Sequence, residues 1–329
     1  MAKLTDFGND LYTGARSIDF VGRRKLWYTI AGVAILLSIL VPILRGGFVF
    51  GIEFTGGSEF QLSNVAQPDE QRAQDAVTEA VPAAEPRVTI VGADGIRVQT
   101  DQLERTESDQ VRDSLAAAFD VDPSQVTANF IGPSWGQDIT QQAIRGLIIF
   151  IVLAAAFMAL YFRTWKMSLA ALSALAHDLI ITIGVYGMLG FEITPAAVIG
   201  FLTILGYSLY DTVVVFDKIR ENTGETTEGS NRTFAQAVNL AVNQTLVRSI
   251  NTSVVAALPV ASILFIGAVV LGAGTLRDIA LALFIGILVG AYSTIFIAAP
   301  VYVHLRENEP EVKKMGSKAK KKVVQGAVR

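Results

Sequence analysis

The sequence predicts a polytopic α-helical membrane protein with six transmembrane helices and one α/β domain between helices 1 and 2. Of 329 residues, 51% are hydrophobic and only 17% are charged, whereas soluble domains carry about 25% charged residues. Residues 46–140 hold 16 acidic and 5 basic residues, and the rest of the chain holds 14 acidic and 22 basic residues. An acidic block inside a basic, hydrophobic chain indicates two compartments.

Six runs with few or no charges approach or exceed the length of about 20 residues that a helix needs to cross a bilayer. They are residues 26–44, 146–162, 167–191, 195–216, 249–276 and 279–305. The second run is short and needs flanking residues. The first is too long for a cleaved signal peptide and no small-residue cleavage site follows it, so we expect it to remain as a helix.

Lysine and arginine flank alternate ends of these runs, which predicts the orientation because cytoplasmic flanks are rich in both. We expect cytoplasmic termini and an extracytoplasmic acidic domain. The expected segments are a cytoplasmic segment at 1–25, helix 1 at 26–45, the outer domain at 46–140, helices 2–6 within 141–305 with a cytoplasmic loop at about 217–248, and a lysine-rich cytoplasmic tail at 306–329. We expect the tail to be disordered and to lie near anionic lipid, with contact to a cytoplasmic partner as the alternative.

The acidic block has the pattern of a small α/β domain. Strands are predicted at 58–62, 87–91, 97–99 and 125–131, and helices at 68–80 and 111–119. Gly92-Ala93-Asp94-Gly95 predicts a hairpin turn, and Thr106 followed by Asp109 resembles a helix N-cap with an acidic third residue. The order strand, helix, strand, strand, helix, strand fits a ferredoxin-like unit.

Two segments follow the fourth run. Residues 222–231 contain no apolar side chain and predict a mobile cytoplasmic loop. Apolar residues then recur at helical spacing from Phe234 to Leu246, which predicts an interfacial helix running into span five.

Asp211 is the only charged residue in the fourth run. A carboxylate at the centre of a membrane helix costs roughly 2.5–3.5 kcal/mol on insertion scales, so such residues usually mark an ion path, a proton relay or a buried partner. The alternative is a carboxylate satisfied by a neighbouring helix. Arg248, at the start of span five, is the expected counter-ion, although its side chain could instead reach lipid phosphate. Making and breaking an Asp211–Arg248 pair would load and unload a proton.

Asp178 is a second intramembrane acid, near the middle of span three, and is equally compatible with a structural anchor and a relay role. Tyr210, Thr212, Asn251 and Thr252 are candidate supporting polar residues, and packing between helices is the default role for such side chains and for Ser208. Gly286 and Gly290 have the GxxxG spacing that predicts close helix packing.

Composition argues against most enzyme classes. The chain has no cysteine and only two histidines, so thiol chemistry and disulfides are impossible and a histidine-based triad or metal site has almost nothing to draw on. We expect no cofactor, no metal, no enzymatic activity and no nucleic-acid partner. Two intramembrane aspartates leave an aspartyl protease as an alternative. Asp178 follows Leu175-Ala176-His177 rather than the Gly-x-Gly of such proteases, which disfavours it.

Five stretches together resemble one family. They are residues 51–57 (GIEFTGG), 131–133 (IGP), 206–222 (GYSLYDTVVVFDKIREN), 248–253 (RSINTS) and 290–300 (GAYSTIFIAAP). In this order and on these spans they are similar to the SecF family, the six-span subunits of the bacterial SecD–SecF protein-export complex. The resemblance implies a resistance-nodulation-division type membrane fold in the bacterial cytoplasmic (plasma) membrane. It implies SecD, the SecYEG channel, indirectly the SecA motor, exported unfolded polypeptide and membrane lipids as partners, and use of the proton-motive force.

The resemblance also implies roles for individual residues. The family's proton-path acid corresponds to Asp211, its arginine to Arg248, and an acidic position of span three to Asp178. Gly51, Gly56 and Gly57 form the glycine loop. Glu53 stands where aspartate is usual, and Tyr210 where many members have asparagine. We expect the change at Glu53 to matter little because the shape of the loop depends on its glycines. A passive assembly factor of the export channel is the competing interpretation.

Overall fold

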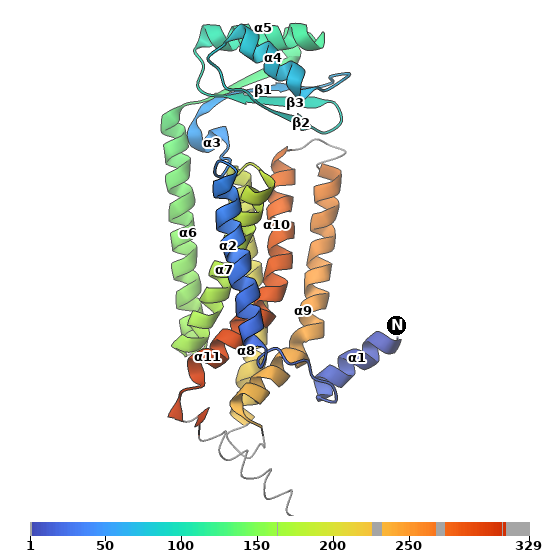
Figure 1. The fold of residues 1–329 in the computed structure, drawn as a ribbon, viewed down its shortest axis with the longest axis vertical. Coiled ribbons are helices and arrows are strands. Elements are labelled where there is room, and N and C mark those ends of the chain that lie inside the picture. Colours follow the sequence, from blue (N-terminus) through green and yellow to red (C-terminus); the bar gives the residue numbers. More distant parts are fainter. Residues whose placement is uncertain (1, 163, 226–231, 268–273, 311, 314–329) are drawn as a thin grey trace, which may run out of the picture.

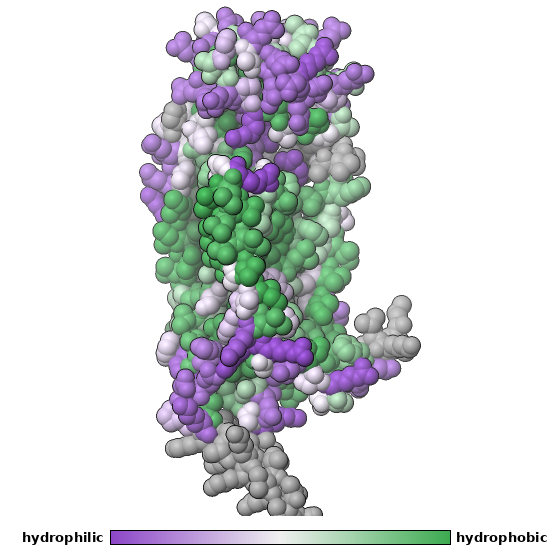
Figure 2. Space-filling model, viewed as in Figure 1, coloured by the Kyte–Doolittle hydropathy of each residue, from purple (hydrophilic) through white to green (hydrophobic). Residues whose placement is uncertain are grey.

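The computed structural model describes residues 2–162, 164–225, 232–267, 274–310 and 312–313. An α/β layer lies at one end of a bundle of long helices (Figure 1). Within the described residues, six helical segments are long and apolar enough to cross a membrane, as the sequence predicts. On the face drawn in Figure 2, a hydrophobic band separates two hydrophilic ends.

The membrane helices are α2 (Arg24–Leu44), α6 (Pro133–Phe162), α7 (Trp165–Leu189), α8 (Pro195–Glu225), α9 (Phe234–Phe265) and α10 (Gly274–Ser293). The last continues through a π-helical turn, η3 (Thr294–Ala298), into α11 (Ala299–Arg306). Two short helices lie outside the spans, α1 (Ala2–Thr13) at the N-terminus and α3 (Ile52–Thr55) before the sheet.

Several helices extend beyond the apolar runs because polar residues continue them. Helix α6 begins at Pro133, so residues 133–140 of the expected outer domain are helical. Helix α8 continues to Glu225 and α9 begins at Phe234, so much of the expected loop at 217–248 is helical. Helix α9 starts before residue 249, residues 268–273 of the expected fifth run lie outside the described residues, and residues 274–276 belong to α10. Residues 226–231 of the expected loop and most of the tail at 306–329 lie outside the described residues.

The outer domain is a four-stranded sheet with two helices on one face (Figure 1). Its strands are β1 (Gly57–Leu62), β2 (Arg87–Val91), β3 (Gly95–Thr100) and β4 (Val126–Ile131), in the order β2-β3-β1-β4 with antiparallel neighbours. Helices α4 (Glu70–Ala80) and α5 (Arg105–Phe119) follow β1 and β3 in the chain. The predicted succession of strands and helices is therefore found.

The core of this domain follows the period-two pattern of its strands. Phe60 and Leu62 of β1 and Ile96 and Val98 of β3 are fully buried with the apolar faces of α4 and α5. The N-cap of α5 differs from the prediction: Glu104 takes this position, and the Glu107 carboxylate accepts a hydrogen bond from the Glu104 N–H at 2.9 Å. The acidic residue that reaches back to the cap thus comes two positions earlier than expected.

The lower part of α9 is buried in protein, contrary to the expected interfacial helix. Its apolar face, including Phe234, Val238 and Val242, belongs to the largest buried cluster. The Phe234 ring lies 5.8 Å from the ring of Tyr302, and Tyr302 lies 5.7 Å from Phe216. The apolar residues at helical spacing do form a helix, but neighbouring helices cover its apolar face.

The GxxxG spacing in α10 produces the predicted close packing against α8. A Cβ atom placed on Gly286 would lie 2.3 Å from Ile204, and one on Gly290 would lie 3.2 Å from Ser208. Only residues without a side chain allow the two backbones to approach this closely.

We expect Gly286→Ala to destabilise the bundle because the added methyl group collides with Ile204, and overpacking costs roughly 1–3 kcal/mol. Thermal unfolding of the detergent-solubilised protein measures the effect. Gly206→Ala is the matched control, since a Cβ there meets nothing within 4 Å. Equal melting temperatures for the two variants would contradict the packing argument.

Candidate functional site

Asp211 is buried between α8 and α9, with 4% of its surface exposed. Its Oδ1 accepts a hydrogen bond from the Ser249 hydroxyl at 3.0 Å. Its Oδ2 is buried and has no hydrogen-bond partner among the described residues. A buried carboxylate with one donor is incompletely compensated for the loss of water. This is the environment of a group that can exchange its charge for a proton.

Arg248 does not pair with Asp211 in this conformation, and the predicted pair, which would be made and broken, stays a prediction. The salt bridges within the described part of the chain do not include this pair, and the Arg248 guanidinium lies 3.5 Å from the Tyr210 hydroxyl. The reason is helical geometry: Arg248 and Ser249 are consecutive residues and point about 100° apart around the axis of α9. Ser249, which was not among the predicted site residues, faces Asp211 in place of Arg248.

Asp178 forms a second buried polar group that joins three helices. Only 2% of its surface is exposed, and its Oδ2 accepts a hydrogen bond from the Ser208 hydroxyl of α8 at 2.5 Å. Its Oδ1 lies 3.2 Å from Nδ1 of His177, and Nε2 of His177 lies 2.6 Å from the Tyr292 hydroxyl of α10. Both oxygens of Asp178 therefore have partners, unlike those of Asp211. The sequence placed His177 beside Asp178 but gave no indication of Tyr292.

One face of α8 connects the two aspartates. Ser208, Asp211 and Thr212 are three and four residues apart and so lie on neighbouring positions of one helix face, and all three are buried. The Thr212 hydroxyl lies 3.1 Å from the Thr294 hydroxyl of η3, where the helix is π-helical. Thr212 thus has the interhelical role expected of a supporting polar residue.

Asn251 and Thr252 do not join this buried group. Asn251 is exposed, and the Thr252 hydroxyl donates to the Arg248 carbonyl of its own helix at 2.9 Å. Tyr210, with 55% of its surface exposed, also points out of the bundle. The predicted polar residues therefore divide into a buried set on α8 and an outward-facing set on α8 and α9.

The glycine loop positions the start of β1. Gly56 and Gly57 have φ angles of +79° and +149°, which L side chains rarely adopt. A Cβ on Gly57 would also lie 2.5 Å from the Thr100 carbonyl oxygen. Gly51 donates its N–H to the Ile193 carbonyl at 3.0 Å, which ties the loop to the turn between α7 and α8.

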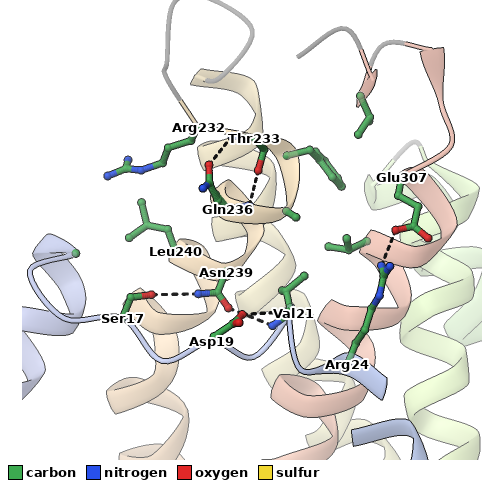
Figure 3. Close-up of a pocket in the computed structure, with 16 residues that line it drawn as sticks. Ser17, Asp19, Val21, Arg24, Arg232, Thr233, Gln236, Asn239, Leu240 and Glu307 are labelled. Carbon is green, nitrogen blue, oxygen red and sulfur yellow. Dashed lines mark hydrogen bonds and ion pairs between the residues drawn. The ribbon is translucent and has the colours of Figure 1, made fainter. Parts of the chain in front are cut away.

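A cavity of about 850 Å³ lies at the opposite end of the molecule, between the N-terminal segment, α9 and the end of α11 (Figure 3). The Asn239 amide oxygen accepts from the N–H groups of Phe20 and Val21, at 2.9 and 3.2 Å. Arg24 forms an ion pair with Glu307 at 2.6 Å. Neither intramembrane aspartate lines this cavity, so it is separate from the buried polar site.

Comparison with known proteins places this arrangement in a family. The family model described as protein export membrane protein SecD/SecF, C-terminal, matches residues 110–308. The chain belongs to the SecD/SecF family of protein export membrane proteins. The matched region includes Asp178, Asp211 and Arg248.

Relatives in the SecD/SecF family are similar to this chain over most of its length. It is 44% identical over 336 residues to the protein translocase subunit SecF of Streptomyces coelicolor, covering 100% of this chain and 87% of the relative. It is 40% identical to SecF of Mycobacterium tuberculosis H37Rv, covering 92% and 70%. A crystal structure of SecDF, a translocon-associated membrane protein from Thermus thermophilus, matches with a TM-score of 0.75 at 28% identity. That match covers 89% of this chain and 39% of the SecDF chain.

We expect Ser208→Ala to destabilise the protein by about 1–3 kcal/mol, because it leaves a buried carboxylate oxygen of Asp178 without its donor. Thr203→Ala on the same helix is the control, since the Thr203 hydroxyl is exposed and donates only to the Ile199 carbonyl of its own helix. Melting temperatures of the two variants give the comparison. An unchanged value for Ser208→Ala would show that this contact does not hold α8 to α7.

Proposed function

We propose that the chain is an accessory subunit of the bacterial protein translocase. In this proposal it uses the proton-motive force, together with SecD, to drive or complete export through the SecYEG channel. The observation that carries the proposal is the carboxylate of Asp211, buried between two helices with one donor and one unpartnered oxygen. The relatives are protein translocase subunits SecF, which supports a role of this chain in protein translocation.

In the proposed cycle, Asp211 alternates between an ionised and a protonated state. The ionised state needs more compensation than the Ser249 hydroxyl gives, and Arg248 is the neighbouring cation. The Arg248 guanidinium lies 3.5 Å from the Tyr210 hydroxyl, which is long for a hydrogen bond and therefore indicates a weak one. Rotation of α9 or of the Arg248 side chain would transfer the guanidinium from Tyr210 to Asp211. A proton that crosses 100 mV supplies about 2.3 kcal/mol to bias this movement.

Asp178 is the secondary member of the proposed proton pathway. Because both of its oxygens have partners, a structural role between α7, α8 and α10 is favoured over proton exchange in this conformation. The contrast with Asp211 also argues against an aspartyl protease, in which two carboxylates share one proton. Here each aspartate has its own hydroxyl donor, Ser208 or Ser249. The proposal therefore involves no bond cleavage by this chain and no cofactor.

The proposed location is the bacterial cytoplasmic membrane, with both termini in the cytoplasm and the α/β domain outside. Basic side chains at the end opposite that domain support this orientation. Lys166 pairs with Glu309 at 2.8 Å and Arg24 with Glu307 at 2.6 Å at this end. The strand order β2-β3-β1-β4, with α4 and α5 on one face, supports the assignment of a ferredoxin-like domain.

The outward-facing polar residues of α8 and α9 support a partner within the membrane. Tyr210, Arg248 and Asn251 are exposed on adjoining helices at the level of Asp211. Lipid cannot satisfy such groups, so they usually face other helices or water. We assign this face to SecD, which would bring its own helices close to the proton site. SecYEG, the exported polypeptide and, indirectly, SecA complete the proposed assembly.

We expect Asp211→Asn to abolish the part of export that depends on the proton gradient, because the amide cannot exchange a proton. The measurement is transport of a secreted protein into vesicles containing SecYEG and SecD with this chain, with and without an uncoupler. Asp217→Asn is the control and should retain the gradient effect. Asp217 lies on the same helix, and its carboxylate accepts a hydrogen bond from the Tyr161 hydroxyl at 2.7 Å. Normal export by Asp211→Asn, together with loss of export on deletion of the chain, would instead support a passive assembly factor.

A further inference from the structure

A buried ion pair connects the outer domain to the membrane helices. Arg97 of β3 reaches Glu192, in the turn between α7 and α8, with 2.9 Å between Nη2 and Oε2. Only 14% of the Arg97 side chain and 9% of the Glu192 side chain are exposed. Such burial is costly for both charges unless they remain paired.

The backbone reinforces the same junction. The segment before β1 pairs with the α7–α8 turn through a parallel bridge between Phe50 and Ile193. The Ile193 N–H donates to the Val49 carbonyl at 2.8 Å, and the Gly51 N–H donates to the Ile193 carbonyl at 3.0 Å. Glu53 follows Phe50 by three residues and Glu192 directly precedes Ile193, so the bridge brings the two carboxylates together.

Two buried carboxylates, those of Glu53 and Glu192, lie close together at this junction, and Arg97 pairs with Glu192. Glu53 Oε2, Glu192 Oε1 and Arg97 Nε are buried and have no hydrogen-bond partner among the described residues. A Cβ on Gly51 would lie 2.3 Å from Glu53 Oε2 and 3.4 Å from Glu192 Oε1, so both carboxylates converge on this glycine. The Glu53 carboxylate therefore lies close to the one that pairs with Arg97, so the small effect expected for this position stays a prediction to be tested.

The two carboxylates belong to different parts of the molecule. Glu53 lies on α3, which precedes β1, whereas Glu192 lies between Leu189, the end of α7, and Pro195, the start of α8. Helices α7 and α8 carry Asp178 and Asp211. Arg97 Nη1 would also be 3.7 Å from a Cβ on Gly274, the first residue of α10. A displacement of these helices would therefore reach Arg97.

We propose that Arg97, Glu192 and Glu53 form a two-state joint that positions the outer domain relative to α7 and α8. When Arg97 pairs with Glu192, the domain is held to the membrane helices. When Arg97 pairs with Glu53 instead, the domain is released from them. The joint rests on the proposed function, because it supplies the route by which movement at Asp211 reaches the outer domain. The three residues act as positioning residues and do not carry protons across the membrane.

The surroundings of Glu53 disfavour its charged form. Burial raises the pKa of Glu53 and the carboxylates of Glu192 and Glu59 raise it further, while a backbone hydrogen bond and, to a smaller extent, Arg97 oppose the shift. A carboxyl whose native pKa is raised contributes stability at low pH that is lost as pH rises through that pKa. Glu53→Gln should therefore raise the melting temperature in mildly alkaline buffer. It should have little effect near the ordinary glutamate pKa of about 4.3. An equal effect at both pH values would show that the Glu53 charge is not the cause.

Spin labels test the joint directly, because the chain has no native cysteine. Labels are attached through Glu79→Cys on α4 and Leu189→Cys at the end of α7, both exposed, and their distance distribution is measured in the reconstituted complex with SecD. We expect Glu192→Gln and Arg97→Gln to broaden the distribution, and Glu53→Gln to narrow it. Arg112→Gln, which removes a surface pair with Asp109 on α5, should change nothing. Broadening by Glu53→Gln, or no change in the Arg97 and Glu192 variants, overturns the proposal.

Export measurements separate this proposal from the proposed function. We expect Glu192→Gln to lower gradient-dependent export about two- to thirty-fold, the range of mutations that alter coupling between sites. If Asp211→Asn abolishes gradient-dependent export but Arg97→Gln and Glu192→Gln leave export and label distances unchanged, only the joint is overturned. If Asp211→Asn leaves export intact while the labels respond as expected, the proton-driven function fails and the mechanical connection stands.

Discussion

The close approach of α8 and α10 is the constraint on which the rest of the bundle depends. Gly286 and Gly290 bring α10 against Ile204 and Ser208, and Ser208, Asp211 and Thr212 of α8 are buried. In a water-free interior each polar group must find a partner within the protein. The hydrogen bonds of Asp178 and Asp211 follow from that requirement.

The two buried aspartates lie in the same helix bundle but differ in how completely their carboxylates are hydrogen-bonded. Asp178 is enclosed by Ser208 and the His177–Tyr292 pair, so its charge distribution is matched on both oxygens. Asp211 has Ser249 on one oxygen only. A site that is fully compensated favours a single state, whereas a partly compensated one leaves two states closer in free energy. This difference is the physical reason for assigning proton exchange to Asp211.

The junction at Glu192 extends the same reasoning to the outer end. Glu53 Oε2, Glu192 Oε1 and Arg97 Nε are all buried without a partner among the described residues, so the hydrogen bonding of this junction is incomplete. In the proposed joint the Arg97–Glu192 pair sets the attachment of the outer domain, and the Phe50–Ile193 bridge lies beside it. Two arrangements of the junction that differ in a single ion pair would allow small, reversible movements of the domain.

The sequence by itself determined the six candidate membrane helices, the succession of strands and helices outside them, and the presence of Asp211 as the only charged residue in the fourth apolar run. These features depend on local hydrophobic pattern and composition, which each segment carries in its own residues. Tertiary structure alone decided that Ser249 donates to Asp211 in this conformation, that Tyr292 completes the Asp178 group, and that Glu53 and Glu192 converge on Gly51. Such partners come from distant parts of the chain, and the rotation of each helix about its axis, which packing sets, determines which side chains meet.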